Sequence, residues 1–161
     1  MNIKVKNKIL NPHSESTLTK IADTMNEVCQ LLDNLYDVNC GGCCYIAYCL
    51  SKLLKADDLD YCLEVVSRDG EDLEDCCDFS ELDRSHSHYG ISISSSYINI
   101  SEEEIEDSYS HCCFPNIDPT LIWKHYEEQE WNDCYDSNKN DFIWEILEKF
   151  YYECTENLRE R

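Results

Sequence analysis

The sequence predicts an α+β fold in which a helix that begins with a cysteine packs on a small antiparallel sheet, with further helices after the sheet. Three observations predict this class. Before residue 56, apolar residues recur in two stretches with the spacing of an amphipathic helix. Between residues 61 and 100, short runs are rich in β-branched and aromatic residues. From residue 118 to residue 158, the helical spacing returns.

Composition limits the classes of partner. The 161-residue chain carries 34 acidic against 13 basic side chains, a net charge of -21. A surface with this charge repels nucleic acid and anionic membranes, so we expect neither as a partner. No stretch approaches the roughly 18 apolar residues of a membrane span, and the N-terminus lacks the apolar core of a secretory signal. We therefore expect one domain, residues 1–161, in the cytoplasm.

The N-terminal part of the chain is expected to contain a strand and a helix. Residues 3–6 alternate in a way that is compatible with an edge strand, which Pro12 ends. Residues 16–36 predict an amphipathic helix with Ser14 or Ser16 as its N-cap. Its apolar face comprises Ile21, Met25, Val28, Leu31, Leu32 and Leu35.

The functional interpretation depends on the stretch NCGGCCYIAYCLSKLL, residues 39–54. The predicted helix begins at Cys43, ends near Lys55 and has its apolar stripe at Ala47, Leu50, Leu53 and Leu54. Unpaired N–H groups and the helix dipole stabilise an anion in the first turn, so a cysteine there has a lowered pKa and becomes a nucleophile. Gly41 and Gly42 allow a sharp turn and the approach of a substrate. The alternative is that Cys43, Cys44 and Cys49 are small apolar residues of a buried helix.

The predicted sheet follows this helix. Residues 61–67 are expected to form a strand, and residues 68–85 an acidic loop that is a candidate flap. Residues 88–93 and 97–100, separated by serines, predict a hairpin. After the acidic run EEEIED, residues 102–107, an irregular connection is expected over residues 108–119.

Two helices are expected after that connection. Asp118 and Pro119 predict the start of a helix that runs to about residue 135. Residues 141–158 predict a last helix. Its buried side comprises Phe142, Ile143, Ile146, Leu147 and Phe150.

Twelve cysteines require an interpretation of their own. Without a secretory signal the expected compartment is reducing, so most of them are predicted to be free thiols rather than a disulfide framework. A zinc site would need paired C-x-x-C motifs, and the motif at residues 40–43 has no second copy. We therefore expect no metal and no cofactor.

A cysteine nucleophile needs a general base within hydrogen-bond reach. His88 begins a predicted strand about 45 residues after Cys43, and a sheet packed on the helix can bring its ring to the thiol. His86 would share the same strand face and is the alternative base. The alternative for His88 is that it has no catalytic role and is an exposed histidine at a strand edge.

The base needs a third group that holds its ring. Asn99 lies on the returning strand of the predicted hairpin. If that hairpin turns at residues 94–96, residues 101–103 lie opposite His88. Glu102 and Glu103 are therefore the rivals of Asn99 as the orienting residue.

These residues resemble the papain-like cysteine hydrolase superfamily, in which a cysteine begins a helix and a histidine and a polar partner lie on neighbouring strands. The transglutaminase-like branch is matched by Gly41, Cys43, Ala47, Leu53 and Leu54, and the NlpC/P60 branch by residues 39–42, NCGG, and 88–91, HYGI. The first alignment implies Cys43 as the nucleophile, and the second implies Cys40. We prefer Cys43, because Cys40 would place both glycines in the first helical turn at about 1 kcal/mol each. The NlpC/P60 resemblance places the orienting residue at Asn99.

The resemblance covers residues 39–100, the papain-like core, and leaves residues 118–158 as a helical C-terminal extension. The GGCC run and the later His-Tyr-x-Ile strand also resemble small phage-encoded papain-like proteins of unassigned role, which implies a host cytoplasm. The implied activity is that of a cysteine hydrolase or acyl transferase acting on a peptide, isopeptide or amide bond. The implied catalytic residues are Cys43, His88 and Asn99. The substrate would be a peptide or protein, and the acidic surface favours a cationic one.

A function of another class is also compatible with the composition. Acidic runs at residues 57–60, 69–83 and 102–107 would give a catalytically inactive protein a charged face. Such an acidic interaction protein would be, for example, a phage inhibitor or a nucleic-acid mimic that blocks a host protein. The two hypotheses differ in whether the Cys43 sulfur lies within reach of a histidine ring.

Overall fold

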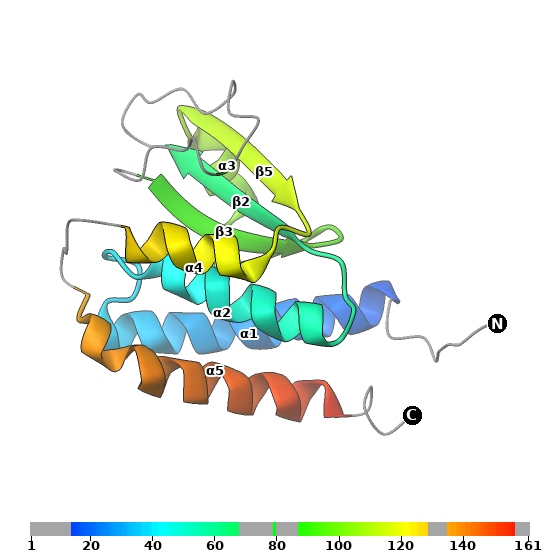
Figure 1. The fold of residues 1–161 in the computed structure, drawn as a ribbon. Coiled ribbons are helices and arrows are strands. Elements are labelled where there is room, and N and C mark those ends of the chain that lie inside the picture. The colour runs from blue at the N-terminus through cyan, green and yellow to red at the C-terminus, as the bar shows by residue number, and fades with distance from the viewer. Residues whose placement is uncertain (1–13, 68–78, 80–86, 129–134, 157–161) are drawn as a thin grey trace.

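The computed structural model describes residues 14–67, 79, 87–128 and 135–156. These residues form an α+β fold, as predicted. The helices are α1 (Glu15–Tyr36), α2 (Cys43–Ala56), α3 (Glu102–Asp107), α4 (Pro119–Glu127) and α5 (Asn140–Cys154). The strands are β2 (Cys62–Ser67), β3 (Ser87–Ile93), β4 (Ser96–Ile98) and β5 (Ser110–Pro115). Figure 1 shows the sheet on one side, α2 and α4 next to it, and α1 and α5 beyond them.

Helix α1 begins as predicted but buries a narrower face. The Ser14 hydroxyl caps it and accepts a hydrogen bond from the Thr17 N–H at 3.3 Å. The buried side chains are Ile21, Ala22, Met25, Val28, Cys29 and Leu32. The prediction was wrong for Leu31 and Leu35, which are 46% and 59% exposed. At 3.6 residues per turn both lie outside the sector that the other six side chains occupy.

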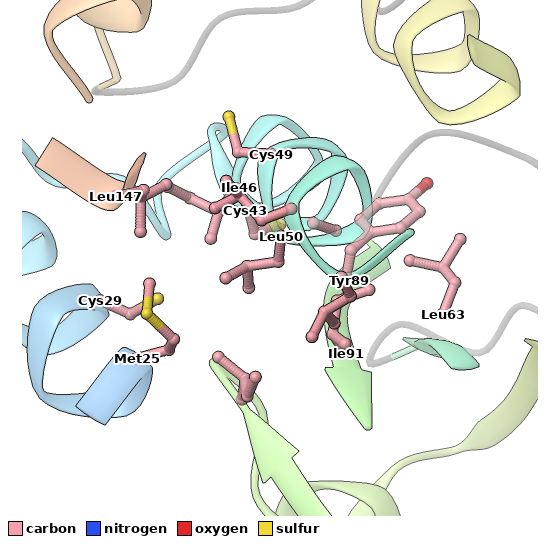
Figure 2. Close-up of a cluster of buried hydrophobic side chains, with 14 of the residues drawn as sticks. Met25, Cys29, Cys43, Ile46, Cys49, Leu50, Leu63, Tyr89, Ile91 and Leu147 are labelled. Atoms are coloured by element: carbon pink, nitrogen blue, oxygen red, sulfur yellow. The ribbon is translucent and has the colours of Figure 1, made fainter. Parts of the chain in front are cut away.

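Helix α2 begins at Cys43, as predicted, and is buried on nearly all sides. Ten of its fourteen residues are buried, which is more than the single stripe that the spacing predicts. The reason is its position, because α2 contacts β3, α4 and α5. Figure 2 shows this interior, to which β3 contributes Tyr89 and Ile91 and α1 contributes Met25 and Cys29. The helix that carries the candidate nucleophile is therefore the centre of the packing.

The sheet is antiparallel, with the strand order β4-β3-β2-β5. The predicted strand at residues 61–67 and the predicted hairpin are confirmed as β2, β3 and β4. Ser94, at φ 55°, lies in the hairpin turn, and Ile98 pairs with Ile91. The pairing stops there, because Asn99 adopts φ 61° and turns the chain out of the strand direction. The expected pairing of residues 101–103 with His88 is therefore absent from the described sheet.

The expected irregular connection over residues 108–119 is wrong, because this segment contains β5, and the acidic run before it, for which no element was predicted, forms α3. Ser101 and Glu104 form a capping box at the start of α3. The Ser101 hydroxyl accepts from the Glu104 N–H at 3.0 Å, and the Glu104 carboxylate accepts from the Ser101 N–H at 3.1 Å. Strand β5 pairs with β2, with Cys113 opposite Glu64. Its sequence, SHCCFP, contains no β-branched residue, so strand propensity gave no signal.

Helix α4 starts where the sequence predicts. Asp118 is its N-cap, and Pro119 is its first residue. It ends at Glu127 instead of about residue 135, and Tyr135 already lies outside a helix. Because α4 packs on α2, the C-terminal part of the chain supports the helix that carries Cys43.

Helix α5 packs against α1 and α2. It buries Ile143 and Leu147, as predicted, whereas Phe142 is 49% exposed, contrary to prediction. The expected strand at residues 3–6 lies outside the described residues, and so does the candidate flap at 68–85 apart from Phe79. No helix in the described part of the chain is long and apolar enough to cross a membrane.

Candidate functional site

The loop of residues 37–42 turns the chain from α1 into α2. Gly41 has φ 107°, a conformation that favours glycine. The Gly42 N–H donates to the Val38 carbonyl at 2.8 Å, and the Cys40 carbonyl accepts from the Tyr135 N–H at 3.0 Å. These hydrogen bonds fix the direction in which α2 begins.

Gly42 is the N-cap of α2 and supplies no side chain to the first N–H groups of the helix. A Cβ at this position would lie 2.7 Å from the Val38 carbonyl oxygen and 2.8 Å from the Tyr135 ring. The sequence suggests a glycine here for the approach of a substrate, whereas the structure fills that space with Tyr135. With no side-chain cap at Gly42, the Cys43 side chain is the first one at the start of the helix.

Cys43 forms a hydrogen bond with His88 at this helix start. Its side chain is buried, with an exposed fraction of 5%. Burial is the largest single effect on the thiol and raises its pKa. The charge and hydrogen bond of His88, together with hydrogen bonds from the Tyr89 and Cys44 backbone N–H groups, outweigh burial and lower the pKa of Cys43. The net effect on the thiol is thus toward the thiolate.

His88 lies on β3 and is 7% exposed. Burial, the largest effect, lowers its pKa, but the charge and hydrogen bond of Cys43 raise it, as do the Asn99 backbone and Glu104. The net pKa is raised. The thiol pKa is lowered and the imidazole pKa is raised, so both shifts act in the direction of the thiolate and imidazolium forms.

The ring of His88 is held by a main-chain group. Its Nε2 lies 2.8 Å from the Asn99 carbonyl oxygen. A carbonyl only accepts hydrogen bonds, so Nε2 carries a proton, and Nδ1 remains for the thiol. The structure thus brings together Cys43, His88 and Asn99, the three residues selected from the sequence. The atom of Asn99 that contacts the ring is the backbone oxygen and not the side-chain amide.

Among the described carboxylates, Glu104 is the one that pairs with the ring. Its Oε2 lies 3.9 Å from His88 Nε2, whereas neither Glu102 nor Glu103 reaches His88. The sequence reasoning missed Glu104, although the capping-box pattern formed with Ser101 was available as a signal. The alternative base, His86, lies outside the described residues.

Cys40, the alternative nucleophile, is in a disulfide bond. A disulfide sulfur has no thiolate to offer, so the geometry supports Cys43 in preference to Cys40. The other eight described cysteines are free, in agreement with the expectation for most of them. Burial raises the pKa of Cys44 well above its usual value and raises that of Cys49 to about 12. Cys44 and Cys49 therefore agree with the alternative hypothesis, in which they are small apolar residues of a buried helix.

A cavity of about 490 Å³ borders the ring of His88. Its lining is mostly neutral and polar, with one carboxylate. The residues are Asn26, Gln30, Asn39, His88, Tyr97, Asn99, Ile100, Ser101 and Glu104. Cys43 is not among the described residues that line it. A ligand in this cavity would therefore meet the imidazole before the sulfur.

The other described histidines are satisfied elsewhere. His125 is buried, and its Nε2 lies 2.6 Å from the Tyr89 hydroxyl oxygen. His111 Nε2 lies 2.6 Å from Glu64 Oε1 on the sheet. Within the described ranges no three His, Cys, Asp or Glu side chains gather in a way that would hold a metal ion.

Comparison with protein-family models, with curated proteins and with solved structures found no match for this chain. The geometry of Cys43 and His88 is therefore the basis for assigning a function.

Proposed function

We propose that the protein is a papain-like cysteine hydrolase or acyl transferase with Cys43 as nucleophile and His88 as its acid and base. One observation supports this most directly. A cysteine at an uncapped helix N-terminus is hydrogen-bonded to a buried histidine, and the pKa of each group is shifted toward the charged pair. This arrangement makes a nucleophile available near neutral pH.

The reaction would proceed through an acyl-enzyme. The Cys43 thiolate attacks the acyl carbon, and N–H groups of the first turn of α2 hold the oxyanion. The C–N bond breaks as the His88 imidazolium gives its proton to the leaving amine. His88 then takes a proton from water, or from an acceptor amine, which attacks the acyl carbon and releases Cys43 as thiolate. Hydrolysis and acyl transfer differ only in this second nucleophile.

The substrate we propose is a peptide, isopeptide or amide, with a preference for a cationic group near the scissile bond. Glu104 supplies a carboxylate to the cavity beside His88, and the chain as a whole carries a charge of -21. A negative field of this kind raises the local concentration of cationic ligands. The preference should therefore weaken as the ionic strength rises.

The proposal is tested by trapping the acyl-enzyme. The protein is incubated with a library of short peptide amides that contain lysine or arginine, quenched in acid and digested for mass spectrometry. We expect an acyl adduct on Cys43 in the wild type and in Cys49→Ala, and none in Cys43→Ala. Neither adduct nor hydrolysis across neutral, cationic and anionic libraries would count against the enzyme.

A second function of another class is favoured by one observation, the burial of the thiol. Cys43 is 5% exposed and does not line the cavity, so the charged pair alone does not bring a substrate to the sulfur. An acidic interaction protein would use its surface instead of its thiol. Tight, salt-dependent binding of a polylysine peptide that is unchanged in Cys43→Ala, without acyl adducts, would favour this function.

A further inference from the structure

Three asparagines from different parts of the chain converge beside His88. Asn26 comes from α1, Asn39 from the loop before α2, and Asn99 from the residue after β4. All three line the cavity that borders the His88 ring. The amide groups of Asn39 and Asn99 are bonded to each other, and that of Asn26 is bonded to the backbone of Tyr97 and Asn99.

Asn26 fixes the backbone on both sides of Ile98, immediately before Asn99. Its Oδ1 accepts the Asn99 N–H at 2.8 Å, and its Nδ2 donates to the Tyr97 carbonyl at 2.5 Å. Asn99 is held at φ 61°, a left-handed conformation that asparagine tolerates better than most residues. In this conformation its carbonyl oxygen reaches His88 Nε2. Asn26 thus takes over the hydrogen bonding of the chain where the β3 and β4 pairing has ended.

Asn39 connects the loop of residues 37–42, which precedes Cys43, to Asn99. Its Nδ2 donates to Asn99 Oδ1 at 3.2 Å, and its Oδ1 accepts from Asn99 Nδ2 at 2.9 Å. Its own N–H donates to Asp33 Oδ1 at 2.9 Å, which anchors the loop on α1. The side chain of Asn99 therefore joins the loop that precedes Cys43, while its carbonyl joins the base.

We propose that Asn26 and Asn39 are positioning residues for His88 that act through Asn99, whose main-chain carbonyl, and not its side chain, orients the imidazole. The inference deepens the proposed function and rests on it. Chemically, the carbonyl holds the proton on Nε2, which keeps Nδ1 directed to the thiol. The amide pair keeps the two loops at a fixed separation, so that the thiol and the ring stay within hydrogen-bond reach.

The test is the pH profile of Cys43 alkylation by iodoacetamide, resolved by mass spectrometry, in full-length variants whose folding is checked by thermal unfolding. In Asn26→Ala we expect alkylation at pH 6 to be about tenfold slower, equivalent to about one pKa unit for the thiol. Asn34→Ala is the matched control. Asn34 is exposed on α1 and does not line the cavity, and its side chain accepts from Gln30 and is bonded to neither Asn99 nor His88.

Asn99→Gly separates the carbonyl from the side chain, because glycine keeps the carbonyl and adopts a positive φ readily. We expect this variant and Asn39→Ala to slow alkylation by a similar, smaller factor, about two- to threefold. The double variant should lose no more than either single one, because both remove the same amide pair. A loss in Asn99→Gly as large as that in His88→Ala would overturn the assignment to the carbonyl.

The outcomes separate the two proposals. If wild-type Cys43 reacts as an ordinary thiol, the proposed function fails, and the inference fails with it. If wild-type Cys43 is reactive at pH 6 and Asn26→Ala keeps the same profile, only the inference is overturned. If Asn26→Ala does not fold, Asn39→Ala and Asn99→Gly decide, because unequal or additive losses contradict a shared role.

Discussion

Cys43 and Cys49 lie on the same helix, and both are buried, yet their thiols differ in opposite directions from an ordinary cysteine. The exposed fractions are 5% and 0%. The pKa of Cys49 is raised to about 12, whereas the pKa of Cys43 is lowered. Cys29 on α1, which is also buried, resembles Cys49, with a pKa raised to about 12. Burial therefore does not decide which thiol is activated.

What differs is the set of groups that face each sulfur. Burial raises the pKa of both thiols, and for Cys49 the Tyr45 hydrogen bond and the Lys52 charge do not offset it. Cys43 has the charge and hydrogen bond of His88 and backbone N–H groups at the start of α2. Six residues along the helix those N–H groups are engaged in the helix itself. A buried cysteine becomes a candidate nucleophile only where a base and an uncapped helix end coincide.

Replacing His88 should have the largest effect, because it should make Cys43 resemble Cys49. In His88→Ala the burial of the thiol persists while its main compensating interaction is lost, so the pKa should rise above the ordinary value. The thiolate fraction near pH 6 should fall about 100-fold, as the alkylation rate would report. Site-resolved alkylation rates measure this loss, with Cys49 as the internal reference whose slow rate should not change. Equal Cys43 alkylation rates in the wild type and in His88→Ala would show that His88 does not activate the thiol.

A change at the start of α2 should also make Cys43 more like Cys49. In Gly42→Ala the added Cβ would meet the Val38 carbonyl oxygen at 2.7 Å and the Tyr135 ring at 2.8 Å. Overpacking of this kind costs about 1–3 kcal/mol of unfolding free energy, and the shift should separate Cys43 from His88. Urea denaturation measures the free energy, and alkylation measures the pair. A variant that matches the wild type in both would show that the glycine is not required.

The pH dependence of the unfolding free energy should also distinguish the two cysteines. Only the Cys43 and His88 pair should contribute a stability that is constant over a range of pH. The raised His88 pKa gives stability that is present below about pH 6.5 and is lost as pH rises through the folded value. The lowered Cys43 pKa gives stability that is present above about pH 8.5 and is lost as pH falls through the folded value. Between these pH values the two slopes cancel, since the folded and unfolded pairs both hold one proton.

Relative to the Cys43→Ala/His88→Ala double variant, the wild type should therefore gain a constant stability between about pH 6.5 and 8.5. The gain should shrink on either side by at most about 1.4 kcal/mol per pH unit. Chemical denaturation at intervals of half a pH unit gives this curve. A gain that changes steadily through the window would mean that the folded pair does not hold one proton across it, or that it titrates with other residues.

The sequence was informative where structure depends on neighbours along the chain. The start of α2 at Cys43 and the position of His88 on a strand were both predicted, because helix and strand signals are local. The capping box of Ser101 and Glu104 was equally local and was overlooked within an acidic run.

The remaining parts of the site depend on contacts between distant residues. Asn26 lies 73 residues before Asn99, and no spacing rule connects the two. The left-handed turn at Asn99 that ends β4 depends on this contact, so the sequence suggested the side chain where the structure uses the carbonyl. Strand β5 likewise carries no propensity signal and is specified by its pairing with β2.

The smallest expected effect concerns the neighbour of the nucleophile. Cys44 is 1% exposed, and its pKa is raised well above the usual value by burial, then by the charge of Cys43. Its Sγ lies 3.9 Å from the Ile122 carbonyl oxygen and points toward α4 rather than toward His88. Cys44→Ala should therefore leave Cys43 alkylation within about twofold of the wild type, since the Cys44 backbone N–H that bonds the thiolate is retained. A larger loss, measured in the same mass-spectrometric assay, would show that adjacent thiols share the activation and that helix position alone does not separate them.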